Sequence, residues 1–205
     1  MNDLEFAALL VSRVCHDLVS PVGAVMNGLE VLEDERDPAM RADALRLVES
    51  SAAQAAARLQ FARLAFGAAG SAGAQLDLNE VGRVVGGLLK GGKVELLWQA
   101  GSLNWPKDWA KLLTNASLFA ADSLPRGGQV LVKTAADAQA PGFQIRATGP
   151  SIRVQEEMAK AARGESGDSV DSRSIQPYLM HKLARALNAG FTLTWSDSAV
   201  EIAAG

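Results

Sequence analysis

The sequence is poor in cysteine, histidine and aromatic residues. One of its 205 residues is cysteine, two are histidine, and aromatic side chains make up 5%. The single cysteine, Cys15, excludes an intrachain disulfide framework and is typical of a reducing compartment. No second histidine or thiol lies within helical spacing of the adjacent pair Cys15 and His16, so no metal site is expected there.

An excess of positive charge is also absent. The net charge is −3 and the isoelectric point about 5.4, which argues against non-specific nucleic-acid binding. The N-terminus lacks the basic region of a signal peptide, and we expect no apolar run that spans a membrane. With 48% hydrophobic and 21% charged residues, the chain is expected to be a folded, soluble, cytoplasmic protein.

Composition divides the chain into two parts. Residues 1–70 contain six arginines but no lysine, tryptophan or tyrosine, whereas residues 71–205 contain all four tryptophans. Small residues fill positions 67–74, which is typical of a flexible linker. We therefore predict two domains, one over residues 1–70 and one over residues 75–205.

The first part carries an apolar seam with alternating steps of three and four residues, the spacing of packed helices. An acidic stretch at 33–36 interrupts it, and Asp37-Pro38 supplies an N-cap and a first-turn proline for a second helix. Pro21 should kink the first helix. The seam comprises Leu4, Ala8, Val11, Cys15, Leu18, Val22, Val25, Leu29 and Leu32, then Leu45, Val48, Ala52, Ala55, Leu59, Ala62 and Phe66.

This pattern predicts an antiparallel hairpin of two helices of about 30 residues each. A lone hairpin would leave much of its apolar stripe in water. Pairing of two hairpins across a two-fold axis, as a dimeric four-helix bundle, would cover that stripe. The alternative is that the hairpin packs on the second domain of its own chain.

The second part has the pattern of an α/β sandwich, in which strands are flanked by helices on one face. Helices are expected at 77–90, 107–123 and 175–188, and strands at 94–98, 129–134, 143–147, 191–195 and 199–202. The fold class is therefore a helical hairpin followed by an α/β sandwich.

His16 is the candidate for chemistry. One position beyond Cys15 in the seam, it is rotated about 100° away from the bundle core. An exposed imidazole is partly neutral near neutral pH, so its ring nitrogen can act as a nucleophile, and Asp17 could orient or deprotonate the other nitrogen. The alternative is a surface histidine without a task. Mostly small neighbours share its face: Ser12, Arg13, Val19, Ser20 and Gly23.

The stretch His-Asp-Leu-Val-Ser-Pro at residues 16–21 resembles the H-box of two-component histidine kinases. The wider stretch at residues 15–24, with Asn-Gly-Leu-Glu at residues 27–30, is more similar to the ChpT-type histidine phosphotransferases of alphaproteobacteria. The resemblance covers nearly the whole chain. It implies a dimeric hairpin that carries a phosphoryl group on His16, followed by a degenerate ATPase-like domain.

In histidine kinases that second domain binds ATP, but its motifs are eroded here. Asn115 falls on the first asparagine of the N-box and Phe119 on the second, where a phenylalanine cannot coordinate Mg²⁺. Ala147 replaces the aspartate that binds adenine, and Ser151 replaces a motif glycine. No glycine occurs at 174–177, where backbone N–H groups would close on phosphates. We therefore expect no ATP binding.

The resulting hypothesis is a phosphorelay carrier that shuttles a phosphoryl group between receiver-domain aspartates. The resemblance implies a hybrid kinase's receiver as donor, response regulators as acceptors, and Mg²⁺ from the receiver, with no cofactor or metal bound by this chain. Arg13, Arg58 and Arg63 could meet acidic groups of a receiver. His181, between apolar neighbours, is expected to be a structural or a surface residue and not a catalytic one. The alternatives are an active ATP-dependent histidine kinase and a non-catalytic dimeric adaptor.

Overall fold

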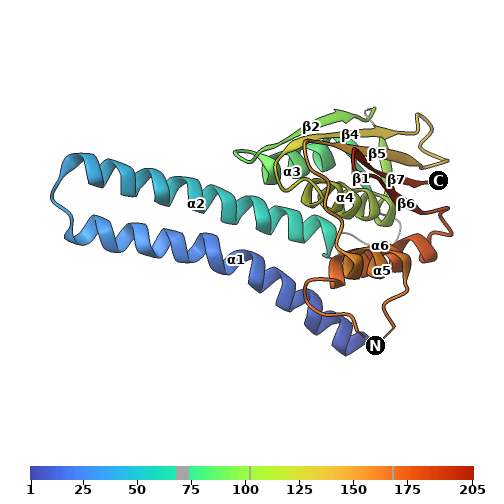
Figure 1. Ribbon diagram of the computed structural model, residues 1–205, viewed down its shortest axis with the longest axis horizontal. Coiled ribbons are helices and arrows are strands. Elements are labelled where there is room, and N and C mark those ends of the chain that lie inside the picture. Colours follow the sequence, from blue (N-terminus) through green and yellow to red (C-terminus); the bar gives the residue numbers. More distant parts are fainter. Residues whose placement is uncertain (68–73, 102, 168) are drawn as a thin grey trace.

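A computed structural model describes residues 1–67, 74–101, 103–167 and 169–205. Figure 1 shows a long helical hairpin that projects from a lobe made of one sheet and the helices packed on it. The predicted linker at 67–74 falls almost entirely outside the described residues. The hairpin and the α/β lobe that the sequence predicts are both present.

The hairpin consists of α1 (Asp3–Asp34) and α2 (Pro38–Ala65), about 48 and 42 Å long. Asn2 caps α1, and its Oδ1 accepts a hydrogen bond from the Glu5 backbone N–H at 2.9 Å. Asp37 caps α2 as predicted, with Oδ1 2.9 Å from the Ala39 backbone nitrogen. Pro21 lies inside α1, which diverges from α2 toward its N-terminal end in Figure 1.

The two helices approach closely at Gly28. A Cβ on Gly28 would lie 2.6 Å from Val48 Cγ2 and 3.2 Å from the Ala44 carbonyl oxygen. Only a residue without a side chain fits this contact. Most of the predicted seam, by contrast, faces solvent in the single chain, as the 81% exposure of Leu4 illustrates. The seam is therefore an unpartnered surface of the monomer.

By length and composition, α1 could cross a membrane, so the expectation that no apolar run is long enough was wrong on that criterion. Core helices of soluble proteins and signal sequences meet the same criterion. In this structure α1 packs along α2 and, near its N-terminus, against the second domain.

The lobe is built on a five-stranded sheet in the order β2-β4-β5-β7-β6, in which β2 and β4 are parallel and all other pairs antiparallel. Figure 1 shows the helices of the lobe on one side of this sheet. The strands are β2 (Val94–Gln99), β4 (Gly128–Thr134), β5 (Phe143–Thr148), β6 (Thr192–Trp195) and β7 (Ala199–Ala204). The helices are α3 (Leu78–Leu89), α4 (Lys107–Asp122), α5 (Glu156–Arg163) and α6 (Ile175–Ala186).

Alternation along the strands places the core between the sheet and these helices. In β5, Phe143, Ile145 and Ala147 are buried while the intervening side chains are exposed. Leu112 and Leu113 of α4 are fully buried against this face. Three short elements lie outside the sequence prediction: α5, and the two-stranded pair of β1 (Gln75–Asp77) and β3 (Asn104–Pro106).

The base of the hairpin packs on the lobe. Near the start of α1, the Phe6 ring lies edge-on to Tyr178 with centroids 6.3 Å apart, and Lys182 Nζ lies 5.0 Å from the Phe6 ring centre. At the end of α2, the Ala65 carbonyl accepts a hydrogen bond from Asn115 Nδ2 at 3.2 Å. Packing against the chain's own second domain is therefore real, but it involves the base of the hairpin and leaves the outer part free (Figure 1).

Candidate functional site

His16 lies midway along α1, and its side chain is 73% exposed. His16 is exposed, as the periodicity predicts. Of the seam residues beside it, Leu18 is half-buried, but Cys15 is exposed in the single chain. Its Nδ1 lies 3.6 Å from Asp17 Oδ1. The other ring nitrogen, Nε2, makes no hydrogen bond to the described residues. The imidazole therefore has a carboxylate near one nitrogen and is open at the other.

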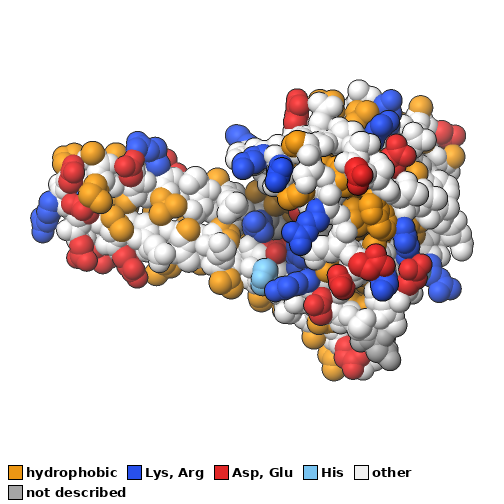
Figure 2. Space-filling view, viewed as in Figure 1, with side chains coloured by type: hydrophobic (Ala, Val, Ile, Leu, Met, Phe, Trp, Pro, Cys, Tyr) orange, Lys and Arg blue, Asp and Glu red, His pale blue; other side chains and the backbone are white. Residues whose placement is uncertain are grey.

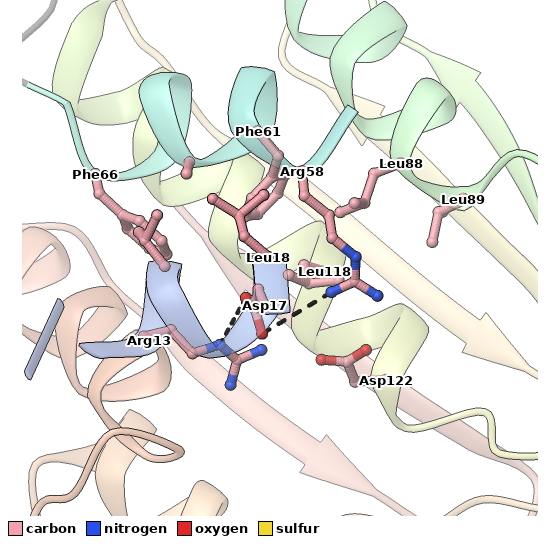
Figure 3. A pocket seen from close by; sticks show the side chains of 12 residues that line it. Arg13, Asp17, Leu18, Arg58, Phe61, Phe66, Leu88, Leu89, Leu118 and Asp122 are labelled. Atoms are coloured by element: carbon pink, nitrogen blue, oxygen red, sulfur yellow. Dashed lines mark hydrogen bonds and ion pairs between the residues drawn. The ribbon is translucent and has the colours of Figure 1, made fainter. Parts of the chain in front are cut away.

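Asp17 contacts His16, and Figure 3 shows Asp17 between the side chains of Arg13 and Arg58. Arg13 Nε donates a hydrogen bond to Asp17 Oδ2 at 2.9 Å, and Arg58 Nη1 lies 3.9 Å from Asp17 Oδ1. The Asp17 side chain is 23% exposed, so both arginines act on a partly desolvated carboxylate. A carboxylate engaged this way is suited to orienting the imidazole and balancing its positive charge rather than to removing its proton.

Asp122, at the end of α4, brings the second domain to this cluster. Asp122, Asp17 and both arginines line one cavity of about 160 Å³. In Figure 3 the Asp122 carboxylate lies near the Arg58 guanidinium. Surrounding protein raises the pKa of the Asp122 carboxyl to about 6, with Arg13 opposing the rise and Asp17 adding to it. The Asp122 side chain also keeps contact with solvent.

The predicted docking residues lie in three settings. Ser12, Val19 and Ser20 are exposed on the same helix as His16, and nothing lies within 4 Å of a Cβ built on Gly23. Arg13 and Arg58 instead reach Asp17, and the Arg58 Nε is buried without a hydrogen-bond partner. Arg63 is exposed in the last turn of α2 and lines neither of the cavities beside His16 and Asp17. The structure thus brings Arg13 and Arg58, but not Arg63, to the site.

The residues that the sequence places at kinase motif positions stabilise the fold of the lobe. Asn115 is fully buried, and its Nδ2 donates to the carbonyls of Lys111 and Ala65 at 2.9 and 3.2 Å. Phe119 is 7% exposed and part of the hydrophobic core. Ala147 is fully buried within β5. The side chains at these motif positions therefore fill the core or bind backbone, and none presents an oxygen ligand to the cavity beside His16.

Two further observations concern possible ligands. Within the described residues, no group of three or more histidine, cysteine, aspartate or glutamate side chains could hold a metal ion. His181 is half-buried in α6, with its ring 6.2 Å from that of Tyr178, and burial lowers the pKa of its imidazole. Contact with Tyr178 and with Gly164 gives His181 a packing role.

Sequence reasoning missed three residues near His16: Asp122, Arg153 and Arg173. All three line cavities that also include residues of α1. They are more than a hundred positions away in the chain, and isolated charged residues in loops or at a helix end carry no periodic signal. Only the docking of the hairpin on the lobe reveals their position.

Comparison with known proteins places the chain among phosphotransferases. Residues 78–199 match the family model of the histidine phosphotransferase C-terminal domain. Over 203 residues, the chain is 39% identical to the protein phosphotransferase ChpT of Brucella abortus (strain 2308). The aligned residues cover 98% of this chain and 95% of that protein.

Two similar solved structures are a phosphotransferase and a histidine kinase. A bacterial phosphotransferase whose structure was solved at 1.7 Å matches with a TM-score of 0.90 and 35% identity, over 100% of this chain and 98% of that chain. The histidine kinase AdeS of Acinetobacter baumannii matches with a TM-score of 0.48 and 14% identity, over 92% of this chain and 95% of that chain.

Proposed function

Because this chain belongs to the ChpT-type histidine phosphotransferases and is a phosphorelay phosphotransferase, we propose that His16 is the residue that carries the phosphoryl group. The observation that carries the proposal is the exposed imidazole with only its Nδ1 facing Asp17. That arrangement leaves Nε2 free to react and places a carboxylate beside Nδ1.

The transfer needs little chemistry from this chain. The Nε2 lone pair attacks the phosphorus of a receiver's aspartyl phosphate, a P–N bond forms, and the P–O bond breaks with its electron pair returning to the aspartate. The ring proton stays on Nδ1, where Asp17 balances the positive charge of the phosphorylated imidazole. Positioning supplies most of the rate, as in other phosphoryl transfers. The reverse reaction passes the group to a second receiver.

Receiver domains of a hybrid histidine kinase and of response regulators are the proposed partners. They would supply Mg²⁺, since the described residues of this chain offer no cluster of metal ligands. The open surface around Gly23, with Ser12, Val19 and Ser20, gives a receiver access to the histidine. Arg13, Arg58 and Arg63 are the cations proposed to face its acidic groups.

Dimerisation through the hairpin is part of the proposal. Among the residues that the structure describes, eleven of the thirteen exposed large hydrophobic side chains lie on α1 and α2, including Val11, Leu29 and Leu59. Figure 2 shows such side chains spread along the projecting hairpin. A second hairpin packed on these residues would form a four-helix bundle and remove the apolar stripe from water.

We also propose that the protein acts in the cytoplasm without ATP, cofactor, membrane or nucleic acid. The side chains that replace kinase ligands support the absence of nucleotide binding: Phe119 lacks an oxygen for Mg²⁺, and Ala147 lacks an acceptor for adenine. The net charge of −3 supports the absence of nucleic-acid binding.

The test is transfer from a phosphorylated receiver in the absence of ATP. Receivers carrying labelled phosphate are mixed with the protein, and the product is assayed for an acid-labile, base-stable phosphate, the signature of phosphohistidine. The proposed carrier becomes labelled and passes the label to a second, unlabelled receiver. Labelling only from ATP would instead identify an autokinase, and no labelling from any receiver of the host would identify an adaptor.

A further inference from the structure

A second cavity opens directly beside His16, with a volume of about 500 Å³. It lies between α1, the end of α4, the segment after β5 and the start of α6. Three arginines line it: Arg13 of the hairpin, and Arg153 and Arg173 of the second domain. Asp122 is the acidic residue of its lining. Figure 2 shows lysine and arginine side chains gathered where the hairpin meets the lobe.

The charges of this cavity are unbalanced. The three arginines and the single acid Asp122 give the lining a formal charge of +2, and Asp17, which pairs with Arg13 from outside the lining, reduces the excess to +1. Arg13 is occupied by Asp17, and its Nη1 also donates to the Arg173 carbonyl at 3.4 Å. The guanidinium groups of Arg153 and Arg173 form no hydrogen bond or ion pair with the described residues. Hydrogen bonds from Ser174, together with the charge of Arg173, lower the pKa of the Asp171 carboxyl, so Arg173 acts partly on that acid. Both guanidinium groups keep their hydrogen-bond donors available for an anion.

Helix α6, twelve residues long, starts at this cavity, but Asp171 already occupies its N-terminal end. Asp171 Oδ1 accepts hydrogen bonds from the backbone N–H groups of Ser174 at 2.8 Å and Arg173 at 3.0 Å. The positive charge of the cavity therefore comes from side chains and not from the helix end. Arginine side chains from two separate loops converge on one space that also includes the imidazole.

Resting on the function proposed above, we propose that Arg153 and Arg173 of the second domain hold the phosphoryl group that His16 carries between transfers. A phosphoryl group adds about −1.5 to −2 charges near neutral pH. On His16 it would lie near two carboxylates, Asp17 and Asp122, whose repulsion the two arginines offset. The second domain then binds the phosphoryl group on His16 and uses no nucleotide.

The experiment loads His16 without a receiver. Phosphoramidate transfers its phosphoryl group to the imidazole and releases ammonia, and the reagent is then removed. The pKa of the bound phosphoryl group is measured from the ³¹P NMR shift across neutral and mildly alkaline pH. Replacement of Arg153 or Arg173 by glutamine should raise this pKa by about one unit, because a nearby cation favours the charged form. The double variant should show a larger rise.

Two matched variants control for charge and for folding. Arg83→Gln removes an exposed arginine of α3 that lines no part of this cavity, so the phosphoryl pKa should be unchanged. Replacement of Arg153 and Arg173 by lysine keeps the positive charge, so the phosphoryl pKa should stay close to its wild-type value. Circular dichroism melting curves establish that each variant is folded before its titration is interpreted.

Several results would overturn the inference. An unchanged phosphoryl pKa in the folded double variant would show that the arginines do not touch the phosphoryl group. If the double variant also accepted the phosphoryl group slowly from a receiver, Arg153 and Arg173 would be contacts for the receiver. Saturable binding of inorganic phosphate to His16→Gln, with the phosphohistidine pKa unaffected by the arginine variants, would assign the cavity to a free anion. Failure of wild-type His16 to take up phosphate from either donor would overturn the proposed function itself.

Discussion

His16 stands on an open helix face, so its removal should cost function and not fold. His16→Gln retains size and hydrogen-bonding capacity but lacks the nucleophilic ring nitrogen. We expect no acid-labile phosphate on this variant after incubation with a phosphorylated receiver, while the free energy of unfolding changes by only about 0.5 kcal/mol, as at other surface sites. Label that persists in His16→Gln, or that maps to His181, would show that the carrier residue is wrongly assigned.

Asp17 should tune the reaction without being indispensable. Asp17→Asn keeps the shape of the side chain but loses the charge that faces His16 Nδ1 at 3.6 Å. It also releases the Arg13 guanidinium, bound at 2.9 Å in the wild type. We expect rapid-mixing experiments to record slower transfer from the receiver, with detectable phosphohistidine still formed. A loss as complete as that of His16→Gln would mean that Asp17 acts as an essential base.

At the scale of elements, periodic patterns predicted the long segments well. The heptad spacing and the Asp37-Pro38 signal located both helices of the hairpin, and strands such as β5 were evident from alternating apolar residues. The sequence did not predict β1 and β3, because each strand has three residues and forms only by pairing with the other. Helix α5 has eight residues, too few turns for a clear period.

The candidate site was predictable only where it is local in sequence. Arg13, His16 and Asp17 share one helix, so helical spacing places them together. Arg58 was found as a charge on the second helix, although its contact with Asp17 follows from the hairpin register. Asp122 depends on how α4 meets the hairpin, which no local pattern encodes.

Two glycines of α1 offer a matched test of the docking face. A Cβ on Gly23 meets nothing within 4 Å, whereas one on Gly28 would lie 2.6 Å from Val48 Cγ2. Gly23→Trp should therefore fold normally yet block the approach to His16, with transfer from the receiver slowed about a hundredfold. Gly28→Trp should lower the free energy of unfolding by about 3 kcal/mol or more, because it overpacks the contact between the helices.

Melting curves and transfer rates for both tryptophan variants separate these effects. A correctly folded Gly23→Trp protein that accepts phosphate at the wild-type rate would place the receiver on another surface. A Gly28→Trp protein as stable as the wild type would mean that the two helices can move apart at this point without cost.

For the whole molecule, the exposed seam predicts a dimer. Leu59 is 52% exposed in the single chain, so a charge there would cost little in a monomer. In a four-helix bundle, Leu59→Asp would bury an unpaired charge, at a cost of several kcal/mol. Sedimentation should therefore give a dimer for the wild type and for the control Leu59→Met, and a monomer for Leu59→Asp. A wild-type protein that sediments as a compact monomer at micromolar concentration would refute the bundle.

The second domain as a whole should not bind ATP. Phe119 fills the place of a metal-binding oxygen, and Ala147 is buried in β5 without an acceptor. Calorimetry with Mg-ATP at millimolar concentration should give no saturable heat. A dissociation constant below about 100 µM, equivalent to roughly −5.5 kcal/mol, would contradict this expectation.

The hydrogen bond between Asn115 Nδ2 and the Ala65 carbonyl has a consequence for chimeric proteins. Leu64, in the same last turn of α2, belongs to the hydrophobic core of the lobe. A splice placed in the chain after residue 67 would separate this turn from the core it completes. A graft of the lobe onto a foreign hairpin should therefore carry the last turn of α2 with it, so that the joint falls inside a helix and not in the linker.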